Sequence, residues 1–218
     1  MKKVYLIGIG YRPFDKRAKE ITLNSKVILA TNRLFEIFKG YEEFEAIRDN
    51  IRVINNMDEM LDYIKCQNCD VTVLASGDPM FFGIGRRAME ELGRDTIEVI
   101  PDLSAIQIAF SRIKETWDDA LLLSLHGEPD PKKGKPYTIS DLPSLLQHHH
   151  KIAVLTDRNN TPSKIAEILK CSLLTVHCPL VIYVCEKLGA VDERIIKGSP
   201  EELLKVSFAE PNIVIIIS

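Results

Sequence analysis

The residues of this sequence best suited to bind a small ligand are Ser-Gly-Asp-Pro at 76–79. The β-branched segment before them, 71–75, predicts a buried strand, and 83–92 after them predicts a helix. Open α/β sheets bind ligands at the carboxyl ends of their strands. There Gly77 would let a ligand approach the backbone, and Asp78 would supply a carboxylate. An ordinary turn with a capping aspartate uses the same residues, so both interpretations stay open.

Two further strand ends carry residues that could meet a ligand. The first predicted strand ends in Gly-Ile-Gly at 8–10, and a later one at 120–125 is followed by His126. A dinucleotide fingerprint would need glycine where Pro13 stands and an acidic residue near Asn32, so the sequence disfavours an NAD-dependent oxidoreductase. We interpret His126 as a substrate or domain contact in preference to a turn histidine.

The other reactive side chains indicate structural roles. Cys66 and Cys69 form a C-x-x-C pair without the second pair that many zinc sites have. His148–His150 close a predicted helix, where partly protonated imidazole is favourable. We therefore predict no metal site. Hydrolase-elbow, zinc-protease and kinase signatures do not occur in the sequence.

Composition and charge narrow the class of protein. The 218 residues are 45% hydrophobic and 27% charged, which is typical of a globular protein with a substantial core. The net charge of -3 disfavours a strong nucleic-acid binder, and no apolar run approaches the ~20 residues that span a bilayer. The apolar start of the chain predicts a strand and not a signal sequence, so the five cysteines are most simply reduced thiols. We expect a cytoplasmic protein that binds neither nucleic acid nor membrane.

Alternating strands and helices predict the elements that position these residues. The polar segment 114–119 carries the only tryptophan, and after it the alternating pattern restarts. We therefore predict two α/β domains, 1–113 and 114–218, each a mostly parallel or mixed sheet flanked by helices. The predicted strands are 3–10, 26–30, 51–54, 71–75, 96–100, 120–125, 151–155, 180–185, 194–197 and 212–217. The predicted helices are 15–23, 32–39, 57–64, 83–92, 103–113, 139–149, 161–169 and 200–205, with a long loop at 128–136.

Together these strand ends resemble the tetrapyrrole methylase family of S-adenosylmethionine (SAM)-dependent enzymes. The residues that carry the resemblance are Gly-Ile-Gly at 8–10, Ser-Gly-Asp-Pro-Met-Phe-Phe-Gly at 76–83 and Pro-Asp-Leu-Ser-Ala at 101–105. Within the family the chain is most similar to the branch that methylates C5 of a corrin precursor in cobalamin biosynthesis. The motifs that carry this finer likeness are Ser-Leu-His-Gly at 124–127, Leu-Thr-Asp at 155–157, Asn-Thr-Pro at 160–162, Glu-Lys-Leu-Gly at 186–189 and Asp-Glu-Arg at 192–194.

The resemblance implies a fold, a reaction and a site. It implies two α/β domains with SAM, the methyl donor, in the cleft between them, and a cobalt-precorrin or metal-free precorrin as the tetrapyrrole substrate. It also implies a homodimer, and a separate protein for C15 methylation and decarboxylation. Carried onto this sequence, the cofactor-binding residues are Gly10, Tyr11, Gly77, Asp78, Phe81, Ser104, Ala105, Thr156 and Asn212. The candidate catalytic residues are His126 and Asp102, which would contact the substrate or assist proton loss.

The chain also departs from the family pattern. The family often has Pro-Gly after Gly-x-Gly, where this chain has Tyr11 and Arg12, and it often has glycine where Asp102 stands. The substrate carboxylates should pair with arginine or lysine, although solvated surface charge explains each candidate at least as well. These candidates are Arg12, Arg33, Arg86 and Arg87. The alternative functions are another enzyme of this fold, for a different corrin or sirohaem position or for diphthamide formation, and a non-catalytic SAM- or nucleotide-binding module.

Overall fold

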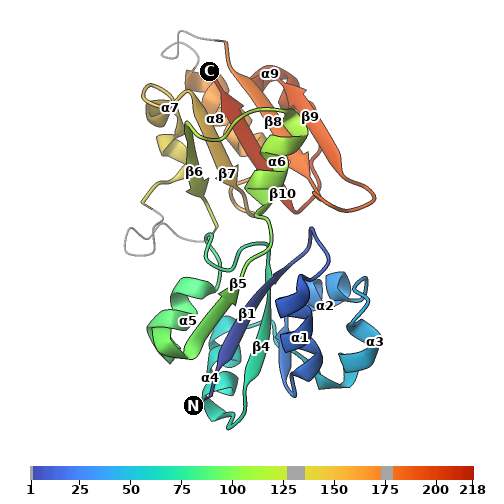
Figure 1. The fold of residues 1–218 in the computed structure, drawn as a ribbon. Helices are drawn as coiled ribbons and strands as arrows, with labels where there is room; N and C mark the ends of the chain where they lie inside the picture. Colours follow the sequence, from blue (N-terminus) through green and yellow to red (C-terminus); the bar gives the residue numbers. More distant parts are fainter. Residues whose placement is uncertain (1, 127–135, 173–178) are drawn as a thin grey trace. The chain divides into compact units, whose positions relative to one another are not determined.

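The computed structural model describes residues 2–126, 136–172 and 179–218. Contacts between residues divide the chain into two compact units, Met1–Ser104 and Ala105–Ser218. Each unit has its own sheet (Figure 1). This division differs from the predicted boundary at 113–114 only in helix α6 (Ala105–Ile113), which packs against β10 (Asn212–Ile217) of the second unit. The predicted boundary itself stays a prediction.

The first unit contains a parallel five-stranded sheet in the order β3-β2-β4-β1-β5. Its strands are β1 (Val4–Ile9), β2 (Ile28–Ala30), β3 (Ile51–Val53), β4 (Val71–Ser76) and β5 (Ile97–Ile100). Val4 of β1 pairs with Val71 on one side and with Ile97 on the other. Because the strands all run the same way, the loops after β1, β4 and β5 lie at one edge of the sheet.

Helices cover both faces of this sheet, because successive residues of a strand point to opposite faces. Val4 and Leu6 pack with α4 (Met57–Cys66) and α5 (Gly85–Leu92). Ile7 and Ile9 pack with the helices of the other face, which Figure 1 shows beside β1 and β4. These helices are α1 (Lys16–Asn24), α2 (Asn32–Phe38) and α3 (Phe44–Ile47), and two 3₁₀ turns are η1 (Arg48–Asn50) and η2 (Arg94–Thr96).

The second unit contains a mixed five-stranded sheet in the order β6-β7-β10-β8-β9. β6 and β7 are parallel, whereas β10 is antiparallel to both β7 and β8, and β9 is antiparallel to β8. The carboxyl ends of β6, β7 and β8 therefore share an edge with the amino end of β10. The strands are β6 (Ala120–Ser124), β7 (Lys151–Leu155), β8 (Val181–Glu186), β9 (Arg194–Gly198) and β10.

One face of this second sheet carries the larger core. Val214 and Ile216 of β10 pack there with residues of the helices α7 (Leu142–Leu145), α8 (Pro162–Ser172) and α9 (Pro200–Leu203). Ile213 and Ile215 are also buried but point to the opposite face. Helix α6 packs against β10 and contributes no residue to the core of the first face, so we assign it to the face of Ile213 and Ile215.

The structure confirms the predicted α/β class and corrects two helices. The predicted helix 139–149 forms only as the 3₁₀ turn η4 (Ile139–Asp141) and α7, because residues 147–150 are polar and offer the core no apolar side chain. Helix α3 has no counterpart in the prediction. Gly127 and most of the predicted loop 128–136 lie outside the described residues. In the described part of the chain, no helix has the length and apolar character needed to cross a membrane.

Candidate functional site

Three loops of the first unit meet at the carboxyl edge of its sheet. The Gly77 amide, after β4, donates to the Ile9 carbonyl at 3.0 Å, and the Asp102 amide, after β5, donates to the Gly77 carbonyl at 3.2 Å. Gly77 has a φ of +59°, and a Cβ there would lie 2.7 Å from the Leu103 carbonyl oxygen. A Cβ on Gly8 would lie 1.9 Å from the Gly77 carbonyl oxygen. Glycine at both positions therefore allows the loops to pack backbone against backbone.

Asp78 stabilises the turn after β4. Its Oδ1 accepts a hydrogen bond from the Met80 amide at 2.8 Å, and its carbonyl accepts one from the Phe81 amide at 3.1 Å. The Phe81 ring packs edge-on against Phe82, with ring centroids 4.8 Å apart. These contacts place Asp78 in a turn, whereas α5 begins only at Gly85 and has no side-chain cap. The cofactor role of Asp78 stays a prediction.

Asp102 is nearly buried, with 4% of its side chain exposed, and it binds the loop after β1. Its Oδ2 accepts hydrogen bonds from the amides of Tyr11 at 2.8 Å and Arg12 at 3.2 Å. Its Oδ1 accepts from the Arg12 guanidinium Nε and from the Leu103 amide, both at 2.7 Å. A buried carboxylate is tolerated when it is paired and hydrogen-bonded. Arg12 and Asp102, which both stand where the family often has other residues, thus bind each other.

The other predicted positions of the first unit lie at the same edge. Ser104 is buried, and its Cα lies 3.3 Å from the position of a Cβ on Gly77. Ala105, the next residue in the chain, is the first residue of α6 and of the second unit. Gly10 has a φ of +133°, and a Cβ there would meet no heavy atom within 4 Å. A ligand could therefore approach the backbone closely at Gly10.

Thr156 and Asn212 of the second unit are in direct contact. Thr156 follows β7, and Asn212 begins the neighbouring strand β10. The Thr156 hydroxyl lies 2.7 Å from the Asn212 carbonyl oxygen and 2.6 Å from its Oδ1. The Asn212 Nδ2 in turn donates to the Ala209 carbonyl at 2.9 Å. The structure thus brings together two residues that the sequence separates by more than fifty positions.

His126 stands two residues after the end of β6 and is exposed. The Leu125 amide before it donates to the Leu155 carbonyl at 2.9 Å, and the Asn160 Nδ2 donates to the Leu125 carbonyl at 2.8 Å. Asn160 therefore links the loop after β7 to the end of β6. These bonds place the backbone of His126 at the carboxyl end of the sheet, and its catalytic role stays a prediction.

Glu186 is a buried residue that sequence reasoning included only as part of a motif. Its Oε2 pairs with the Arg194 Nε at 2.7 Å, and its Oε1 accepts the Ala209 amide at 2.7 Å. Arg194 also donates to the Ser207 carbonyl at 2.7 Å. These contacts hold the segment that precedes Asn212. The sequence signal for such a residue is a glutamate at the end of an apolar strand. A glutamate buried there needs a partner for its charge, so it predicts an ion pair.

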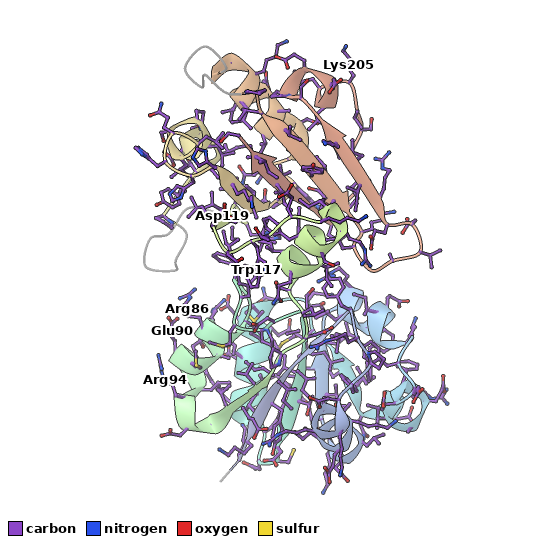
Figure 2. The ribbon with its side chains drawn as sticks, turned by 45° about the horizontal axis from the view of Figure 1, so that its top comes forward. Arg86, Glu90, Arg94, Trp117, Asp119 and Lys205 are labelled. Carbon is purple, nitrogen blue, oxygen red and sulfur yellow. The ribbon has the colours of Figure 1, made fainter. Side chains whose placement is uncertain are left out.

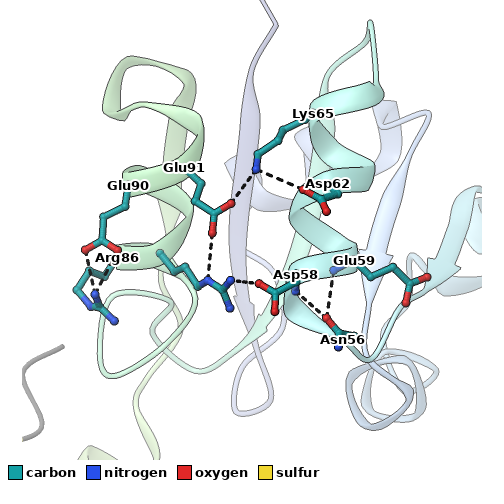
Figure 3. A network of polar contacts seen from close by, with 9 residues as sticks. Asn56, Asp58, Glu59, Asp62, Lys65, Arg86, Glu90 and Glu91 are labelled. Atoms are coloured by element: carbon teal, nitrogen blue, oxygen red, sulfur yellow. Dashed lines mark hydrogen bonds and ion pairs between the residues drawn. The ribbon is translucent and has the colours of Figure 1, made fainter. Parts of the chain in front are cut away.

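The arginines considered for substrate carboxylates have other partners or are exposed. Arg86 and Glu90 project from the outer side of α5 (Figure 2) and form an ion pair at 2.9 Å. The guanidinium of the neighbouring Arg87 pairs with Asp58 and Glu91, two carboxylates that Figure 3 shows on facing helices. Exposed pairs of this kind contribute little to stability. The surface-charge interpretation is therefore favoured for Arg86 and Arg87, while Arg12 binds Asp102 and Arg33 is exposed at the start of α2.

The described cysteines are free thiols, namely Cys66, Cys69, Cys171 and Cys185. Burial raises the pKa of Cys185 to about 12, so this thiol stays protonated and is a poor nucleophile near neutral pH. Among the described residues, no three or more His, Cys, Asp or Glu side chains gather where they could hold a metal ion.

The chain is similar to known proteins at three levels, namely a family model, curated sequences and solved structures. A model described as Tetrapyrrole (Corrin/Porphyrin) Methylases matches residues 3–204. A Methanocaldococcus jannaschii protein named as a probable cobalt-precorrin-7 C(5)-methyltransferase is 26% identical over 214 residues, covering 94% of this chain and 93% of that one. The precorrin-6Y methylase structure from Archaeoglobus fulgidus has a TM-score of 0.70 at 21% identity, covering 100% of this chain and 97% of that one. A uroporphyrin-III C-methyltransferase from Thermus thermophilus, complexed with S-adenyl homocysteine, has a TM-score of 0.69 at 19% identity, covering 99% and 97%. Because the family model matches nearly the whole chain, the protein belongs to the tetrapyrrole methylase family.

Proposed function

We propose that this protein is a SAM-dependent methyltransferase that methylates C5 of a cobalt-precorrin, or of a metal-free precorrin, in cobalamin biosynthesis. The observation that carries the proposal is the relative named as a probable cobalt-precorrin-7 C(5)-methyltransferase, whose similarity extends over 94% of this chain. The motifs at 124–127 and 186–189 support the same branch of the family by resemblance.

The loops of the first unit fit a cofactor that approaches the backbone. The space at Gly10 is open, and the packing at Gly77 leaves no room for a side chain between the loops. Small residues at such strand ends are typical of nucleotide and cofactor sites. The residues proposed to hold SAM are Gly10, Tyr11, Gly77, Asp78, Phe81 and Ser104 of the first unit, together with Ala105, Thr156 and Asn212 of the second unit.

The reaction depends more on the alignment of methyl donor and acceptor than on acid–base catalysis. SAM supplies a methyl group that already carries a good leaving group, so the protein mainly has to orient donor and acceptor. The acceptor would be a meso carbon of an electron-rich tetrapyrrole, and the macrocycle can lose its proton later without a strong base. In this proposal His126 contacts the substrate or assists that proton loss.

The decisive experiment is incubation of the protein with labelled SAM and each pathway intermediate. Mass spectrometry and NMR would locate the new methyl group, which we expect at C5. A methyl group at another position would favour a different enzyme of this fold. Binding of SAM without transfer to any intermediate would favour the non-catalytic module. For His126→Ala, wild-type turnover would rule out a catalytic need, whereas lost proton transfer should slow turnover about 100-fold or more.

The proposal includes a homodimer, a cytoplasmic location and a separate protein for C15 methylation and decarboxylation. Light scattering of the purified protein measures the oligomeric state directly, and a monomer at the assay concentration would contradict the dimer.

A further inference from the structure

The loop 10–12, which follows β1, is held by two side chains from other parts of the first unit. Asp102 accepts hydrogen bonds from the amides of Tyr11 and Arg12, at 2.8 and 3.2 Å. The Tyr41 hydroxyl accepts the Gly10 amide at 2.9 Å and donates to the Arg12 carbonyl, also at 2.9 Å. Three consecutive backbone N–H groups are therefore used by side chains of the protein.

Both holding side chains are themselves fixed in place. The Tyr41 ring packs against Phe14 and Phe38, with centroid distances of 4.9 and 5.3 Å. Burial raises the pKa of Tyr41, so its hydroxyl keeps the proton that it donates. Asp102 is anchored by the bond from its own amide to the Gly77 carbonyl, at 3.2 Å. These constraints favour one loop conformation before any ligand binds.

We infer that Asp102 and Tyr41 are positioning residues that fix the loop 10–12 in its binding conformation and withhold its three amides from the cofactor. The inference rests on the proposed function, since SAM is the ligand whose binding the loop would serve. Successive backbone amides in a loop commonly bind anionic groups. Because side chains of the protein use all three amides of this loop, these amides cannot bind an anionic group of the cofactor. A preorganised loop loses less entropy on binding. Loosening it should therefore weaken SAM binding more than it slows methyl transfer.

The competing role for Asp102 is the proton transfer expected from the sequence. An ionised carboxylate has about four acceptor positions. The amides of Tyr11, Arg12 and Leu103 and the Arg12 guanidinium take up four bonds to Asp102. The side chain would have to give up part of this set to reach a substrate, which would release the loop at the same time.

The test compares Asp102→Asn and Tyr41→Phe with the control Glu98→Gln. Glu98 lies on β5, the strand that precedes Asp102. It pairs with the exposed Arg17 at 2.6 Å and makes no ion pair with the loop 10–12. Asp102→Asn keeps the shape of the side chain and removes its charge and one acceptor oxygen. Without ligand, we expect the Tyr11 and Arg12 amides to exchange about tenfold faster by NMR, and the SAM Kd to rise about tenfold. At saturating SAM, kcat should stay within about twofold of wild type, and the pH profile should keep its shape.

Different results would overturn the inference. Unchanged amide exchange in Asp102→Asn would remove the positioning role. An unchanged SAM Kd combined with a fall in kcat and the loss of one limb of the pH profile would assign proton transfer to Asp102. If Asp102→Asn does not fold, Tyr41→Phe is the deciding variant, because it removes only one hydroxyl. It should speed exchange of the Gly10 amide, and unchanged exchange of that amide contradicts the inference. Failure of the wild type to bind SAM would count against the proposed function alone, since the exchange measurement needs no ligand.

Discussion

Gly8→Ala should separate the three loops that form the carboxyl edge of the first sheet. Gly8 is buried in β1, and a Cβ there would lie 1.9 Å from the Gly77 carbonyl oxygen and 2.4 Å from the Asp102 amide nitrogen. Ordinary van der Waals contact begins only at 3.4 Å. Both neighbours are backbone atoms, so no side-chain rotation can relieve the contact. The loops after β4 and β5 must therefore move.

The cost can be worked out from these contacts. Overpacking a rigid interior costs about 1–3 kcal/mol. Displacing the Gly77 carbonyl also strains its 3.2 Å hydrogen bond from Asp102, a loss of about 1 kcal/mol. We expect the free energy of unfolding to fall by roughly 2–4 kcal/mol relative to a matched substitution. The matched control is Gly40→Ala, whose Cβ would lie at an ordinary 3.4 Å from the Ile37 carbonyl oxygen. Both substitutions stiffen the unfolded chain alike, so their difference isolates the contact.

Urea unfolding of both variants measures this difference. Hydrogen exchange of peptides from β1, β4 and β7 then localises it, because only the first two peptides should lose protection. Titration with SAM should show a Kd raised about tenfold or more for Gly8→Ala and unchanged for Gly40→Ala. If the two variants unfold at the same urea concentration, the reasoning about close backbone packing at Gly8 is refuted.

Three further predictions concern other residues. Asp78→Ala removes the oxygen that accepts the Met80 amide in the turn, so the SAM affinity measured by calorimetry should fall about tenfold. An unchanged affinity would show that Asp78 does not position SAM. Thr156→Val removes the hydroxyl bound to Asn212, which should lower the free energy of unfolding by about 1 kcal/mol; Thr156→Ser should restore most of it, and a failure to do so would contradict the assignment. Burial raises the pKa of Cys185 from 9.0 to about 12, so its contribution to stability is complete below about pH 9 and is lost as the pH rises toward about 12. Cys185→Ala should flatten the stability–pH curve in that range, and iodoacetamide should modify exposed Cys66 but not Cys185 in the native protein near neutral pH.

Local features of this fold could be predicted because they depend on neighbouring residues. Apolar runs predict every strand that the structure describes. Asp15 predicts the start of α1, and its Oδ1 accepts the Ala18 amide at 2.7 Å. Ser-Gly-Asp-Pro at 76–79 predicts a turn at the end of β4, which is where the turn lies. The prediction fails where a helix depends on packing, as in α7, because the polar residues 147–150 that follow Leu146 offer the core no apolar side chain.

Relations between distant segments could not be predicted in this way. The apolar pattern of β10 marks a buried strand but not its direction, which depends on its pairing with β7 and β8. Likewise, Asp102 is visible in the sequence as a carboxylate beside a predicted cofactor loop. Its hydrogen-bond partner Tyr11 stands 91 residues away in the sequence. No motif or spacing in the sequence marks Tyr41 as a partner of the loop 10–12.

The sequence by itself determined the class of fold, the ends of the strands and the resemblance to the tetrapyrrole methylases. Only the tertiary structure decided which loops meet and how their polar groups are used. The physical reason is that hydrogen bonds are made between groups within about 3 Å, and the pairing of β1 with β4 and β5 decides which groups those are. Asp102 therefore reaches the loop 10–12 because β5 lies beside β1 in the sheet. Tyr41 reaches it because its ring packs against Phe14 and Phe38, and no spacing along the chain shows either neighbour.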